Sequence, residues 1–75
     1  HNVDAEVLEF RVQENSPVTK KLIKDINLTK NAVFGGVIRN GIAHMTFGDF
    51  QILAGDKAVV FCLPEAIHKV EKLFN

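Results

Sequence analysis

The sequence predicts an α+β fold of two layers, in which two helices cover a four- to five-stranded, mostly antiparallel sheet. Three observations lead to this class. Apolar and polar residues alternate near the start of the chain, an Asn-Gly pair separates two extended segments, and two other segments have apolar residues at helical spacing. Because a tight hairpin joins antiparallel strands, the sheet is not expected to be wholly parallel.

The first element is expected to be a half-buried strand over residues 6–13. Leu8, Phe10 and Val12 fall on one face of it, and polar residues separate them. Side chains of a strand alternate between its two faces, so this order predicts one face on the core and one in water.

An amphipathic helix is predicted next, from Pro17 to about Asn27. Ser16 stands where a helix N-cap is expected, and proline is favoured at the first helical position. Apolar side chains then recur every four residues, which places them on one face of a helix. These residues are Val18, Leu22 and Ile26.

Two strands joined by a tight turn are predicted for the middle of the chain. Residues 32–38 are almost all apolar, so we expect a strand buried on both faces, with Gly35-Gly36 marking a bulge or a close backbone approach. Asn40-Gly41 favours a type I′ turn, because both central residues of that turn need positive φ. The returning strand is expected over residues 42–46.

The last part of the chain is predicted to hold a short extended piece, a strand and a helix. Turns at Gly48-Asp49 and Gly55-Asp56 flank the extended piece around residues 50–53. The strand covers residues 57–63, and Pro64 ends it and begins the helix. The apolar face of this helix comprises Ile67, Val70, Leu73 and Phe74.

The composition indicates one small domain, residues 1–75, that depends on a partner. A core of 75 residues is thin, and Cys62 is the only cysteine, so no disulfide can stabilise it. We therefore expect oligomerisation or a covering domain. Because the chain opens at His1 without a methionine, we expect it to be excised from a larger protein.

Charge and hydropathy exclude several partners. Nine Lys and Arg balance nine Asp and Glu, which is unlike a general nucleic-acid binder. The apolar stretches are strand-sized, so direct membrane insertion is not expected. A single buried-looking thiol suits a reducing, cytoplasmic setting.

The sequence offers no pattern typical of an enzyme or a metal centre. His1, His44 and His68 are far apart, and Cys62 lies in mid-strand, where a buried thiol is favoured over a reactive one. The aspartates of the two Gly-Asp turns are more typical of backbone hydrogen bonding than of acid–base catalysis. We therefore expect no catalytic residue and no metal.

Arg39 and Asn40 are the candidate ligand-binding residues. Arg39 ends an otherwise apolar strand, directly before the turn. It is either a surface arginine at a strand end or, with Asn40, part of a groove that binds an anion or a carboxylate through two parallel hydrogen bonds.

Several short motifs, in this order and spacing, resemble the TrkA C-terminal domain family, also called the RCK C-terminal domain. The resemblance covers essentially the whole chain, including the start at residues 5–10 and the end at residues 69–74. Because residues 69–74 resemble the end of the full-length family protein, the resemblance implies that the chain comes from the C-terminal end of that larger protein. The motifs are Val37-Ile38-Arg39-Asn40-Gly41, Gly48-Asp49, Gly55-Asp56-Lys57-Ala58-Val59-Val60-Phe61 and Pro64-Glu65-Ala66.

The resemblance implies a cytoplasmic regulator of potassium transport that reaches the inner membrane through a transporter subunit. In this family the domain follows a Rossmann-type domain that binds NAD or ATP, pairs with itself as a homodimer, and helps to gate a membrane potassium transporter. No cofactor is implied for this domain itself. Two alternatives stay open: a purely structural oligomerisation domain, and the same domain attached to another cation or anion transporter.

The family also implies an effector site. In some relatives the dimer cleft binds cyclic di-AMP or another small effector, and Arg39 matches an arginine near the end of the second strand of some nucleotide-binding relatives. Those relatives have a proline at the end of the third strand, where this chain has Thr46-Phe47. That departure weakens the case for cyclic di-AMP in this chain.

Overall fold

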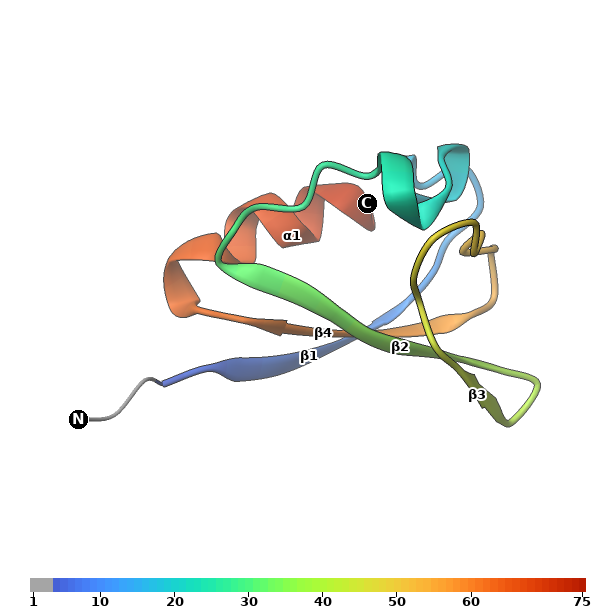
Figure 1. Cartoon of the computed structure of the whole chain (residues 1–75), viewed down its shortest axis with the longest axis horizontal. Helices are drawn as coiled ribbons and strands as arrows, with labels where there is room; N and C mark the ends of the chain where they lie inside the picture. Colours follow the sequence, from blue (N-terminus) through green and yellow to red (C-terminus); the bar gives the residue numbers. More distant parts are fainter. Residues whose placement is uncertain (1–3) are drawn as a thin grey trace.

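The computed structural model describes residues 4–75, which form one antiparallel sheet with a helical layer on one face (Figure 1). The strand order is β1-β4-β2-β3, so the last strand in the sequence lies between the first two. The strands are β1 Glu6–Arg11, β2 Ala32–Arg39, β3 Ile42–His44 and β4 Lys57–Cys62. The predicted α+β class and antiparallel sheet are confirmed.

The helical layer consists of one α-helix and three short 3₁₀ turns. Figure 1 shows α1 and the turns of residues 17–25 on the same side of the sheet, while the other side stays uncovered. These elements are η1 Pro17–Lys20, η2 Ile23–Asp25, η3 Pro64–Ala66 and α1 Ile67–Leu73. The core lies between sheet and layer and comprises Val12, Val18, Val37, Ile52, Ala58, Val60, Cys62, Ala66, Val70 and Phe74.

The prediction of one helix from Pro17 to about Asn27 is wrong. The chain forms η1 and η2 there, and Lys21 and Leu22 between them are extended. Leu22 makes a bridge with Gln51, whose side-chain amide donates to the Lys21 carbonyl at 3.1 Å. These tertiary bonds compete with helical ones in a short segment rich in β-branched residues, which have modest helix propensity.

Strand β2 has the predicted bulge but only one buried face. Its register against β4 shifts between Phe34 and Gly36, so the bulge at the glycines is confirmed. Val33 and Ile38 are 59% and 39% exposed, which contradicts burial on both faces. The reason is that the helical layer covers a single side of the sheet.

The hairpin between β2 and β3 is confirmed. Asn40 and Gly41 have φ of 53° and 78°, and Arg39 faces Ile42 across the turn. Both central residues therefore adopt the positive φ that a type I′ turn needs. The returning strand ends at His44, two residues earlier than predicted.

The last helix is anchored at its C-terminal end. The ring of Phe74 stacks on Phe10 of β1, with 4.2 Å between centroids and 2° between planes. The buried Ser16 hydroxyl donates to the Phe74 carbonyl at 3.2 Å. Ser16 does precede the first turn, as predicted, but its side chain binds this distant carbonyl and makes no capping bond.

Candidate functional site

Arg39 lies at the end of β2, next to the start of β4. Its Nε donates to Asp56 Oδ1 at 2.8 Å, and its Nη2 donates to Asp56 Oδ2 at 2.7 Å. The fork therefore holds a carboxylate through two parallel hydrogen bonds, and that carboxylate belongs to the chain itself. A ligand role for Arg39 remains a prediction, and an anionic ligand would have to bind beside Asp56 or displace it.

Asp56 is the more buried member of this pair. Its side chain is 3% exposed, against 28% for Arg39. Burial alone would raise the pKa of Asp56, but the hydrogen bonds from Arg39 and from the Leu53 amide outweigh it, so the pKa lies below its ordinary value. Asp56 is therefore ionised at neutral pH.

Two further residues complete the surroundings of Arg39. The Arg39 guanidinium donates to the Gln51 carbonyl at 2.8 Å and lies 5.0 Å from the centroid of the Phe50 ring. The Gln51 side-chain amide donates to the Thr19 carbonyl at 2.9 Å. The cluster thus connects β2, the segment around Gln51 and the first 3₁₀ turn.

Sequence reasoning did not find this cluster. Asp56 was expected to bond its own backbone, and it does accept from the Leu53 amide at 2.9 Å. The pairing of β2 with β4, which sets Ile38 opposite Lys57, brings Arg39 beside Asp56. Only the strand order could have indicated that contact.

Asn40 is exposed at the tip of the hairpin, directly after Arg39. Its φ of 53° shows that it serves the turn. No hydrogen bond joins its side chain to Arg39, Asp56 or Gln51, so a ligand role for Asn40 stays a prediction.

The uncovered face of the sheet carries a row of apolar side chains. Phe61 of β4 faces Val7 of β1 on one side and Val33 of β2 on the other. Their exposed fractions are 43%, 58% and 59%. We call these three residues the apolar row; such a cluster on an uncovered sheet face is typical of a contact surface.

The Phe61 ring lies directly over Gly35. A Cβ atom at Gly35 would come within 2.3 Å of Phe61 Cε2, so only glycine leaves room for the ring in this position. A shallow depression of about 260 Å³ adjoins the ring and includes Ala5, Ala32 and Leu63 in its lining. The glycine therefore shapes the uncovered face.

The remaining candidates for a reactive or metal-binding group are the cysteine and the histidines. Cys62 is buried, and burial raises the pKa of its thiol, which makes it unreactive at neutral pH. His1 lies outside the described residues. Within residues 4–75 there is no group of three or more His, Cys, Asp or Glu side chains that could hold a metal ion. No helix in that same range has the length and apolar character to cross a bilayer.

Comparisons with known proteins agree on one family. The family model of the TrkA-C domain matches residues 7–75. The Trk system potassium uptake protein TrkA of Azorhizobium caulinodans is 38% identical over 70 residues, covering 93% of this chain and 15% of that protein. TrkA homolog 1 of Methanosarcina mazei, also named a Trk system potassium uptake protein, is 31% identical over 71 residues, covering 95% and 16%.

The Trk system potassium uptake protein TrkA homolog of Archaeoglobus fulgidus is 30% identical over 70 residues, again 93% of this chain and 16% of the relative. The chain therefore spans only 15–16% of the length of these relatives. The family match itself includes every strand and helix described above, apart from the first residue of β1. The chain belongs to the TrkA-C domain family.

Proposed function

We propose that this chain is a non-enzymatic regulatory domain that pairs with a second copy of itself and helps to gate a membrane potassium transporter. The family match over residues 7–75 carries this proposal, together with three relatives that align with 93–95% of this chain and are named potassium uptake proteins. The domain would act on the cytoplasmic side of the membrane, attached through the transporter subunit. A Rossmann-type domain binding NAD or ATP would precede it in the full-length protein.

The apolar row supports the self-pairing part of the proposal. Val7, Val33 and Phe61 together expose an apolar surface on the side of the sheet that the helical layer leaves open. Covering this surface with a second copy would contribute about 25 cal/mol per Å² of apolar area removed from water. That contribution would supplement the thin core of a small domain.

A purely structural oligomerisation domain is the second candidate, and the Arg39–Asp56 pair favours it. The bonds that Arg39 makes to described residues use Nε and Nη2, so the edge of the guanidinium that these two atoms form is already occupied. A domain whose candidate anion-binding arginine already holds its own carboxylate can assemble without an effector.

Sedimentation equilibrium across a range of concentrations, with and without cyclic di-AMP, tests both candidates. A dimer that tightens with the nucleotide supports a regulatory domain with an effector cleft. A dimer indifferent to the nucleotide supports the structural candidate, and a strict monomer at every concentration contradicts self-pairing.

Two variants show whether Arg39 and Asn40 mediate a nucleotide effect. Asn40→Gly removes the side-chain amide and keeps the positive φ of the turn. Arg39→Lys keeps the charge beside Asp56 and removes the fork. If the nucleotide binds here, both variants should lose the tightening; a nucleotide effect that survives in both would place the site elsewhere.

A further inference from the structure

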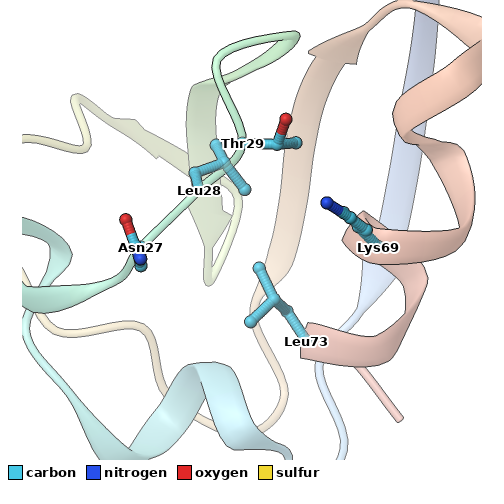
Figure 2. A pocket seen from close by; sticks show the side chains of 5 residues that line it. All are labelled: Asn27, Leu28, Thr29, Lys69 and Leu73. Atoms are coloured by element: carbon cyan, nitrogen blue, oxygen red, sulfur yellow. The ribbon is translucent and has the colours of Figure 1, made fainter.

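A hollow within the helical layer lies between α1 and the segment that follows η2. It has a volume of about 240 Å³. We call it the α1 pocket, and Figure 2 shows that two of its side chains project from α1 while the others come from the facing segment. The lining residues are Asn27, Leu28, Thr29, Lys69 and Leu73.

The one charged side chain of the α1 pocket, Lys69, has no acidic partner among the described residues. The pocket lining itself contains no carboxylate. Thr29 Oγ1 accepts from the Asn31 amide at 3.3 Å, so its hydroxyl proton stays available to donate. Figure 2 shows Lys69 and Thr29 at the same end of the pocket, with the Thr29 oxygen turned away from Lys69, so the Lys69 ammonium is the donor that can meet an anionic group there.

Two of the residues that line the α1 pocket are leucines. Leu73 follows Lys69 by four residues, so both lie on the same face of α1. Figure 2 shows Leu28 pointing toward Leu73 from the facing segment, and both leucines are half-buried. A ligand with a charged end and an aliphatic end would match this arrangement.

The charge distribution of the chain favours an anion at this place. The segments that build the helical layer, residues 17–30 and 64–74, hold six lysines and three acidic residues. The rest of the chain holds three basic and six acidic residues, so the zero net charge conceals two opposed halves. Lys69 is the charged residue among those that line the pocket, and an excess of positive charge in the surrounding layer raises the local concentration of anions.

We infer that the α1 pocket binds a small aliphatic carboxylate, with the carboxylate at Lys69 Nζ and the carbon chain against Leu28 and Leu73. The pocket is smaller than the roughly 300–1,000 Å³ of common drug-sized sites, which suits a short chain and excludes a dinucleotide. It shares no residue with the Arg39–Asp56 pair or the apolar row, so the inference is independent of self-pairing.

Titration of the ¹⁵N-labelled chain with sodium hexanoate, followed by NMR, tests the inference. Sodium chloride at equal ionic strength controls for screening, and inorganic phosphate tests the contribution of the aliphatic part. Lys69→Gln removes the proposed cation. Lys72→Gln is the matched control, because it removes the same charge from the same helix outside the pocket lining.

Hexanoate should cause saturable shifts at the amides of Thr29 and Leu73, and phosphate should bind more weakly. Lys69→Gln should weaken hexanoate binding about tenfold, while Lys72→Gln should change it less than about twofold. The inference is overturned if sodium chloride reproduces the shifts, if no saturable shift appears, or if the two variants weaken binding equally. Equal affinity for phosphate and hexanoate would overturn the role of the two leucines.

Discussion

Arg39 and Asp56 form an ion pair in which one charge is almost completely buried, at 3% exposure, while the other stays in contact with water. Removing a charged partner from a buried carboxylate leaves its desolvation cost without compensation, which is more damaging than the loss of one hydrogen bond. The same pair also fixes the turn before β4, because Asp56 accepts the Leu53 amide. A single arginine thus supports a loop, a strand end and a carboxylate.

Replacing Arg39 with methionine should lower the free energy of unfolding by about 2–4 kcal/mol, because Asp56 would remain buried and unpaired. Urea unfolding measures the change. Lys24→Ala is the matched control, since it breaks an exposed pair with Asp49 at 2.9 Å and should cost less than about 0.5 kcal/mol. Equal losses in the two variants would contradict the structural role of Arg39.

The same variant should change the dependence of stability on pH. In the folded protein the pKa of Asp56 lies below its unfolded value of about 3.9, so Asp56 stabilises the fold above that pH. This contribution is lost as the pH falls through the folded pKa. In Arg39→Met, burial without the arginine favours the protonated form of Asp56. The difference in free energy of unfolding between wild type and variant should therefore become smaller as the pH falls from about 7 to about 3. A constant gap would contradict the coupling.

Strand β2 contains a bulge at its two glycines and packs against the Phe61 ring of β4. Gly35 lies under the Phe61 ring, and Gly36 has φ of 146°, which favours glycine. The two glycines therefore have different causes: one leaves space for a side chain and the other permits a backbone conformation.

Gly35→Ala should destabilise the domain by about 1–2 kcal/mol, because the new Cβ would overlap the Phe61 ring. The cost should nearly vanish in a Phe61→Ala background, where nothing occupies that space. A double-mutant cycle by thermal unfolding measures this coupling. An equal cost in both backgrounds would show that the backbone at Gly35, and not the ring, requires glycine.

The elements also show how far the sequence alone could predict this molecule. The Asn40-Gly41 turn and the bulge at Gly35-Gly36 were predictable, because each depends on the backbone freedom of neighbouring residues. The irregular structure after Pro17 could not be predicted, because a four-residue spacing of apolar residues fits both a regular helix and the observed 3₁₀ turns. The distant Gln51 side chain stabilises the irregular form by donating to backbone carbonyls of this segment. The Arg39–Asp56 contact spans 17 residues and depends on strand order.

At the scale of the whole molecule, the layers are unequal. One face of the sheet is sealed by α1 and the 3₁₀ turns, and the other exposes the apolar row. A two-layer domain with one bare apolar face has a natural place for a partner, and the proposed partner is a second copy.

Val33→Asp should weaken the dimer at least about tenfold, because pairing would bury an uncompensated carboxylate in the apolar row. The monomer should keep its stability, since Val33 is 59% exposed. Sedimentation equilibrium gives the dissociation constant. Ile42→Asp is the control, because Ile42 is 62% exposed and lies outside the apolar row. If only Ile42→Asp weakened the dimer, the interface would lie at the β2–β3 hairpin and not at the apolar row.

The position of β4 has a consequence for synthesis on the ribosome. Strand β1 bonds only to β4 in the sheet, and β2 bonds to β4 and to the short β3, yet β4 occupies residues 57–62. Until those residues leave the exit tunnel, β1 has no partner strand and the apolar side chains of β1 and β2 have no sheet to join. The nascent chain can close its own hairpin at Asn40-Gly41, but the sheet forms in one late step once β4 emerges. A translational pause before residues 57–62 have left the exit tunnel would therefore prolong the interval in which a holdase chaperone can bind the unfinished domain.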